Sequence, residues 1–98
     1  MYARVSTTVL QPGKIDEQAR RYEENTLPEV KKLKGFKGVL RLANRESNKV
    51  MTIALWDTEA DMKASESSGF YSGVVANARN SGFIAQHQME HYEVILQA

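Results

Sequence analysis

The 98-residue sequence contains no cysteine. A disulfide framework, a thiolate nucleophile and any zinc site that needs cysteine ligands are therefore excluded. Because disulfides are rare in reducing compartments, this absence is consistent with a cytoplasmic protein. A Gly-rich phosphate loop and a Ser-His-Asp arrangement are also missing, so the common nucleotide-binding and nucleophilic motifs give no lead.

An excess of one charge and a long hydrophobic run are lacking as well. Lys and Arg number 13 against 12 Asp and Glu, and the two signs are interspersed, so nothing predicts binding to nucleic acid. No apolar stretch approaches the roughly 18 residues that a membrane helix needs. We therefore expect a soluble protein that binds no membrane, with one domain over residues 1–98.

Four segments have the composition and alternation of β-strands. They are Tyr2–Leu10, Phe36–Ala43, Val50–Trp56 and Gln86–Gln97. Apolar residues at spacings of three or four predict a helix over residues 14–34. This helix must kink or restart at Pro28, because proline cannot donate the helical hydrogen bond. Thr58 and Asp61 resemble a capping box that starts a second helix, which Gly69 interrupts before a further short helical segment.

The predicted order is strand, helix, strand, strand, helix, strand. This order is typical of an α+β ferredoxin-like fold, a split βαβ arrangement (βαββαβ) with one antiparallel sheet and both helices on one face. Two helices cover only one face, yet both faces of the predicted sheet are apolar. One face is expected to hold Ala3, Val5, Leu40, Leu42, Ile53, Leu55, Tyr92, Val94 and Leu96, with Phe36 grouped beside Leu40 and Leu42. The other face is expected to hold Arg4, Ser6, Val39, Arg41, Ala54, Trp56, Met89, His91 and Ile95.

Exposure of Trp56, Met89 and Ile95 together would leave an apolar patch larger than monomers usually carry. The pattern therefore predicts a homodimer that packs sheet against sheet.

The chain resembles the antibiotic biosynthesis monooxygenase-like family of dimeric α+β barrels, over nearly its whole length. The resembling residues are Gln11–Lys14, Pro28–Glu29, Lys34–Gly38, Leu55–Asp61 and His91–Val94. The resemblance implies a dimer and one of several activities. Enzymes of this family include cofactor-independent oxygenases of phenolic or quinol-like substrates, haem-degrading oxygenases and small-molecule isomerases, and other members have no assigned reaction.

The resemblance also allows the haem-degrading branch to be examined. That branch has an Asn on the first strand and a Trp and a His on the second helix. Here the first strand offers Ser6, Thr7 and Thr8, and residues 62–78 contain neither Trp nor His. These departures argue against haem degradation.

His91 is the candidate catalytic base, because a histidine ordinarily titrates near pH 6.5 and suits proton abstraction from a phenol. A strand histidine is more often an interface residue hydrogen-bonded to a carboxylate, and that alternative stays open. His87, flanked by glutamines, is expected to be exposed. The two histidines share a face but lie roughly 13 Å apart by strand rise, too far for one metal ion, so we expect no metal and no other cofactor.

Four aromatic residues are candidate walls for a flat substrate: Trp56, Tyr22, Phe70 and Tyr71. Each has a simpler reading as a core residue, and Trp56 has a second one as an interface anchor. The break at Gly69 makes a pocket plausible beside Phe70 and Tyr71, because an interrupted helix leaves room over the sheet.

Ser6 and Arg41 are candidate hydrogen-bond donors to a substrate oxygen. Arg4 lies on the same predicted face as Arg41, and the two can hold an anionic oxygen. A salt bridge with Glu93 or Glu46 is the simpler explanation for either arginine.

Two functions follow as hypotheses. The first is a cofactor-independent monooxygenase that deprotonates a small aromatic phenol or quinol, so that the anion reacts directly with dioxygen. The alternative is a non-catalytic dimeric module of the same fold, which binds a small molecule or stabilises an assembly. Isomerase activity stays open, since nothing in the sequence argues for or against it.

Overall fold

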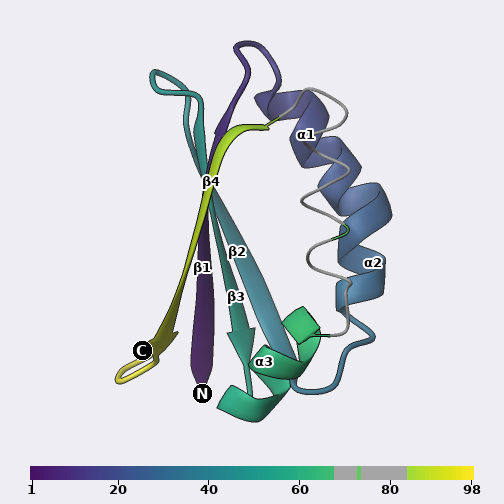
Figure 1. Ribbon diagram of the computed structural model, residues 1–98, viewed down its shortest axis with the longest axis vertical. Helices are drawn as coiled ribbons and strands as arrows, with labels where there is room; N and C mark the ends of the chain where they lie inside the picture. The colour runs from purple at the N-terminus through teal and green to yellow at the C-terminus, as the bar shows by residue number, and fades with distance from the viewer. Residues whose placement is uncertain (68–72, 74–83) are drawn as a thin grey trace.

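The computed structural model describes residues 1–67, 73 and 84–98. Its elements are β1 (Tyr2–Leu10), α1 (Ile15–Arg21), the π-helical η1 (Tyr22–Thr26), α2 (Leu27–Val30), β2 (Phe36–Asn44), β3 (Lys49–Trp56), α3 (Glu59–Ser67) and β4 (Ile84–Glu93). The strands form a four-stranded sheet in the order β2-β3-β1-β4, and every pair is antiparallel. Figure 1 shows α1, α2 and α3 on the same side of this sheet. The predicted α+β ferredoxin-like fold is confirmed.

The strand expected to reach Gln97 ends at Glu93. The short helical segment expected after Gly69 lies, apart from Gly73, outside the described residues. No helix in the described part of the chain is long and apolar enough to cross a membrane.

The helical layer is interrupted where the sequence predicts. Pro28 is the second residue of α2, and α2 begins directly after the five-residue π-helical turn η1. Proline lacks an N–H group, and its ring crowds the carbonyl four residues back. A wider π turn just before Pro28 lets the chain restart as α2 without that contact. The expected restart with Pro28 in the first turn is therefore confirmed.

A β-bulge near the start of β2 changes one predicted face. Phe36 pairs with Trp56 and Gly38 pairs with Leu55, so Lys37 is an extra residue in β2. The extra residue reverses the alternation. Phe36 therefore packs against the helix-side cluster with Val39, and its ring meets Trp56 edge to face at 5.7 Å. The grouping of Phe36 with Leu40 and Leu42 is wrong.

Trp56 lies under the helices rather than on the uncovered face. Its side chain is 0% exposed and belongs to a core cluster with Val30, Ala54 and Met62. The expectation that Trp56 belongs to an exposed apolar patch is therefore wrong, whereas its reading as a core anchor is confirmed.

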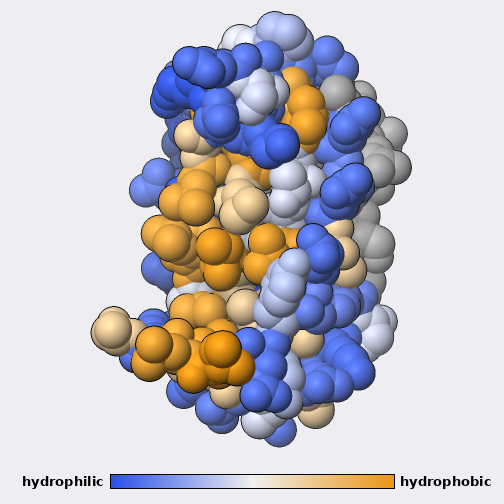
Figure 2. Space-filling model, turned by 90° about the vertical axis from the view of Figure 1, so that its left-hand side faces the viewer, coloured by the Kyte–Doolittle hydropathy of each residue, from blue (hydrophilic) through white to orange (hydrophobic). Residues whose placement is uncertain are grey.

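The uncovered face of the sheet is apolar all the same. Leu40, Leu42 and Tyr92 are 57%, 47% and 48% exposed. Figure 2 shows apolar side chains gathered over this face, with hydrophilic ones around them. The face without helices therefore carries Leu40, Leu42 and Tyr92 instead of Trp56.

The turn from β3 into α3 is built around Gly35. The backbone N–H of Asp57 donates to the Gly35 carbonyl at 2.8 Å, and the N–H of Asp61 donates to Thr58 Oγ1 at 3.0 Å. The Thr58 cap at the start of the second helix is thus confirmed. Gly35 has a φ of +81°, and a Cβ there would lie 2.6 Å from Asp61 Cβ.

Gly35→Ala is expected to destabilise the protein more than Gly13→Ala. Gly13 has a φ of +79°, but a methyl group added there would meet no atom within 4 Å, so its replacement costs about 1–2 kcal/mol from backbone strain alone. At Gly35 the steric conflict adds roughly 1–3 kcal/mol. Urea denaturation of the two variants measures the difference. Equal losses of unfolding free energy would show that Asp61 moves away without cost.

Candidate functional site

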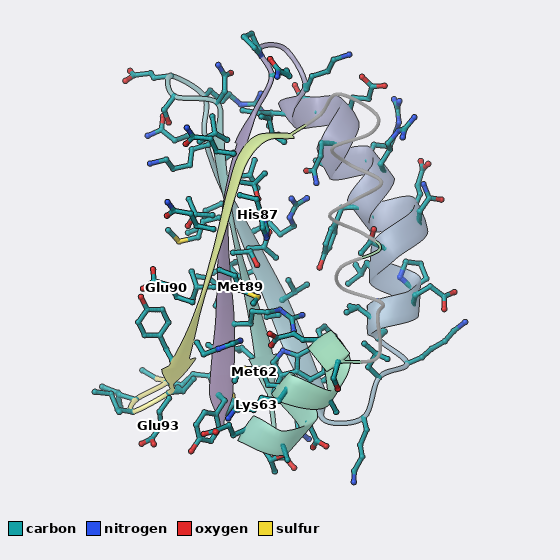
Figure 3. The ribbon with its side chains drawn as sticks, viewed as in Figure 1. Met62, Lys63, His87, Met89, Glu90 and Glu93 are labelled. Carbon is teal, nitrogen blue, oxygen red and sulfur yellow. The ribbon has the colours of Figure 1, made fainter. Side chains whose placement is uncertain are left out.

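The side of the sheet that faces the helices carries most of its polar strand residues. Arg4 and Ser6 on β1 lie opposite His91 and Met89 on β4. Ser6 also lies opposite Thr52 on β3, and Thr52 lies opposite Arg41 on β2. Figure 3 shows His87 and Met89 on the helix side of β4, with Glu90 on the other side. The strand register thus brings the predicted residues His91, Ser6 and Arg41 to one face.

His91 forms a hydrogen-bonded pair with Glu66 of α3. His91 Nε2 lies 2.8 Å from Glu66 Oε2 and 3.0 Å from Oε1. An ionised carboxylate only accepts hydrogen bonds, so Nε2 carries the proton and the lone pair of a neutral ring lies on Nδ1. This arrangement leaves Nδ1 as the nitrogen that can accept a proton.

Arg4 also contacts Glu66, at the same carboxylate oxygen that lies nearest to His91. Arg4 Nη1 donates to Ser65 Oγ at 2.6 Å and lies 3.5 Å from Glu66 Oε2. The Arg4 guanidinium also lies over the Trp56 ring, with Cζ 5.3 Å from the centroid. Arg4 is only 5% exposed, so its charge needs the carboxylate close by. The acid that pairs with Arg4 is Glu66, and the expected bridge to Glu93 or Glu46 is wrong.

Arg41 has a different environment, made of neutral groups. Its Nε donates to Thr52 Oγ1 at 3.0 Å, and its Nη2 donates to Gln18 Oε1 at 2.8 Å. The guanidinium stacks on Tyr22, with Cζ 4.2 Å from the ring centroid. Burial lowers the pKa of Arg41. Within residues 1–67, 73 and 84–98 no carboxylate pairs with Arg41, so the expected bridge to Glu93 or Glu46 is wrong here also.

Burial also raises the pKa of the Tyr22 hydroxyl above its ordinary value of 10, against the opposing charges of Arg41 and Arg4. Above pH 10 the unfolded chain therefore loses this proton before the folded chain does. The free energy of unfolding is expected to fall as the pH rises from 10 through the higher pKa of the folded state. Urea denaturation at about pH 9 and about pH 11 measures this fall. Tyr22→Phe should show a smaller fall than the wild type, and an equal fall would contradict the assignment to Tyr22.

The other predicted residues have mixed outcomes. Ser6 is buried on the same face. His87, expected to be exposed, is half-buried and pairs through Nδ1 with Thr8 Oγ1 at 3.0 Å. Phe70 and Tyr71 lie outside the described residues. Among the described residues, no three His, Asp or Glu side chains lie close enough to hold a metal ion.

Glu66 was not found by sequence reasoning. It lies four residues after the buried Met62 in α3, and residues at that spacing share a helix face. The spacing from Met62 indicates that Glu66 lies on the helix face that packs on the sheet. It does not indicate that Glu66 contacts a residue of β4.

No protein-family model matches the sequence, and no curated protein matches it. Solved structures do match. The heme-degrader MhuD from Mycobacterium tuberculosis, solved with two hemes in its active site, has a TM-score of 0.78 at 16% identity, covering 100% of this chain and 99% of MhuD. The monooxygenase from the gene ActVA-Orf6 of Streptomyces coelicolor, solved with nanaomycin D, has a TM-score of 0.74 at 16% identity, covering 99% of this chain and 92% of that one.

A third match is a candidate antibiotic biosynthesis monooxygenase from Nitrosomonas europaea. Its TM-score is 0.75 at 11% identity, and the match covers 96% of this chain and 89% of that one. The chain has the antibiotic biosynthesis monooxygenase fold. The TM-scores establish the shared fold. Because the sequence identities are only 11–16%, the reaction must be argued from the chain's own residues.

Proposed function

We propose that this chain is a cofactor-independent monooxygenase that acts on a small aromatic substrate of phenol or quinol type. The observation that carries the proposal is the His91–Glu66 pair, with 2.8 Å between Nε2 and Oε2. A histidine held by a carboxylate is the usual arrangement of a general base. The shared fold with a monooxygenase solved in complex with nanaomycin D supports a monooxygenase reaction on a small molecule.

In the proposed reaction, His91 Nδ1 accepts the proton of the phenol. The resulting anion is electron-rich and supplies the electrons that reduce dioxygen. One oxygen atom forms a bond to a ring carbon, and the other leaves as water with two hydrogens from the substrate. Ser6 and Arg41 are the proposed donors to the substrate oxygens, and Tyr22 is the proposed wall. The protein therefore needs to bind the ring, remove a proton and exclude water.

We also propose that two copies pack through their uncovered sheet faces. The exposed Leu40, Leu42 and Tyr92 support this assembly, because a contiguous apolar patch on a soluble protein usually marks an interface.

We propose a cytoplasmic location for the protein. The absence of cysteine fits this location, because disulfides are rare in reducing compartments.

Oxygen uptake by metal-stripped, flavin-free protein tests the activity, with hydroquinones and anthrones as substrates. We expect uptake above spontaneous oxidation, in proportion to protein concentration. The melting temperature is measured with the same compounds under nitrogen, because a bound ligand stabilises the folded state whether or not it reacts.

A binding module without catalysis is the second candidate. Arg41 and Tyr22 favour it, because the contact of the guanidinium with the ring joins β2 and η1 and can bind a ligand without any action of His91. Compounds that raise the melting temperature without oxygen uptake would support this candidate.

Haem fits the chain poorly as a substrate. The two histidines of the chain, His87 and His91, both lie on β4. His87 pairs with Thr8, and His91 pairs with Glu66. Residues 62–78 contain no histidine and no tryptophan.

A further inference from the structure

We propose that Arg41 binds an anionic oxygen of the ligand, and that this oxygen belongs to a carboxylate remote from the hydroxyl that reacts. The assignment of this carboxylate to the substrate rests on the function proposed above, whereas the anion site itself is argued from Arg41 alone.

The first argument is the number of unused donors. A guanidinium has five N–H bonds in one plane. Arg41 uses one on Thr52 Oγ1 and one on Gln18 Oε1. The remaining three meet no acceptor within the part of the chain that the structure describes. Arginine recognises carboxylates through parallel N–H donors. The unused N–H groups of Arg41 therefore suit a carboxylate.

The second argument compares Arg41 with Arg4, which lies on the same sheet face. Arg4 has an acid partner in Glu66 at 3.5 Å. Arg41 is half-buried among Thr52, Gln18 and the Tyr22 ring, all of them neutral. A cation removed from water without an anion is costly, and burial lowers the pKa of Arg41 in keeping with that cost. An anionic ligand group would supply the missing charge.

The third argument is the separation of Arg41 from His91. The strand order places β2 and β4 at opposite edges of the sheet, so the two backbones are roughly 14 Å apart across three strand spacings. We therefore expect a hydroxyl held at His91 and a carboxylate held at Arg41 to lie at separate ends of the ligand. The ligand class is an aromatic acid whose carboxylate is distant from its phenol.

Isothermal titration under nitrogen tests the site with three probes: 2-naphthoate, the neutral 2-naphthamide, and naphthalene-1,4-diol. We expect the wild type to bind 2-naphthoate about tenfold tighter than 2-naphthamide, and Arg41→Gln to bind the two equally. Arg45→Gln is the matched control, because Arg45 lies in the turn between β2 and β3 and forms an exposed ion pair with Asp16. This control and His91→Ala should both keep the discrimination.

Two results would overturn the proposal. One is a wild type that binds 2-naphthoate and 2-naphthamide equally. The other is an Arg41→Gln variant that loses affinity for naphthalene-1,4-diol alone, because a phenol oxygen would then be the group at Arg41. If Arg41→Gln does not fold, Arg41→Lys replaces it, and loss of at least half of the discrimination is the expected result.

The outcomes for the two proposals are separable. Discrimination in favour of 2-naphthoate without oxygen uptake would support the anion site and count against the oxygenase. Oxygen uptake together with equal affinity for 2-naphthoate and 2-naphthamide would support the oxygenase and count against the anion site.

Discussion

His91→Ala is expected to lower the rate of oxygen uptake by roughly 10²–10⁴-fold, the usual contribution of a general base. The reason is that, of the two histidines, His91 is the one that a carboxylate holds in the described part of the chain, through Glu66. Initial rates with saturating hydroquinone measure the effect. The affinity for 2-naphthoate should stay unchanged, because Arg41 lies at the other edge of the sheet.

His87→Ala is the matched control for this prediction. His87 lies on the same strand and the same face, but it pairs with Thr8 rather than with an acid. Its replacement should leave the rate within a few-fold of the wild type. Glu66→Gln should lower kcat more than it changes KM, since it removes the carboxylate that orients the ring. Equal rates in the wild type and His91→Ala would contradict the role of His91 as base.

The second large effect concerns the uncovered sheet face. The double variant Leu40→Lys, Leu42→Lys is expected to convert a dimer into a monomer. Both side chains are about half exposed on that face, and a dimer would bury two lysine charges from each copy, at a cost of several kcal/mol per charge. Analytical ultracentrifugation measures the mass in solution.

Asn25→Lys is the matched control for the sheet face. Asn25 is an exposed residue of η1, on the opposite side of the molecule from the uncovered sheet face, so a lysine there should leave the dimer intact. A wild type that sediments as a single chain at micromolar concentration would contradict the dimer.

The sequence was sufficient for the fold because each element carries a local signal. Alternation identified β1, β2 and β4, and a nearly continuous apolar run identified β3. Pro28 marked the start of α2, and Thr58 marked the start of α3. Two structural facts had no local signal. One is the bulge at Lys37, which moves Phe36 to the helix face. The other is which face the helices cover, since both faces are apolar in the sequence.

The site was predicted in part. Sequence reasoning selected His91, Ser6 and Arg41, and the strand register brings all three to the helix side of the sheet. It could not assign their partners, because a side-chain pair between α3 and β4 depends on how the helix lies over the sheet. Glu66 was therefore missed, and Arg41 was expected to have an acid partner that it does not have in the described residues.

The two arginines are expected to respond differently to mutation. Arg4 pairs with Glu66 and lies over the Trp56 ring, so its loss should disturb both the base and the core. Arg41 contacts Tyr22, Thr52 and Gln18, and its loss should chiefly alter which ligand binds. We therefore expect Arg4 to matter chiefly for folding and for the base, and Arg41 chiefly for ligand recognition.

The most direct test of the central claim is the fate of labelled dioxygen. Metal-stripped, flavin-free protein is incubated with a hydroquinone or an anthrone under ¹⁸O₂, and the product is analysed by mass spectrometry. The account predicts one labelled oxygen atom in the product, formed in proportion to protein concentration and lost in His91→Ala. Product without label, or no product above spontaneous oxidation with any compound tested, would contradict cofactor-independent oxygenation by this chain.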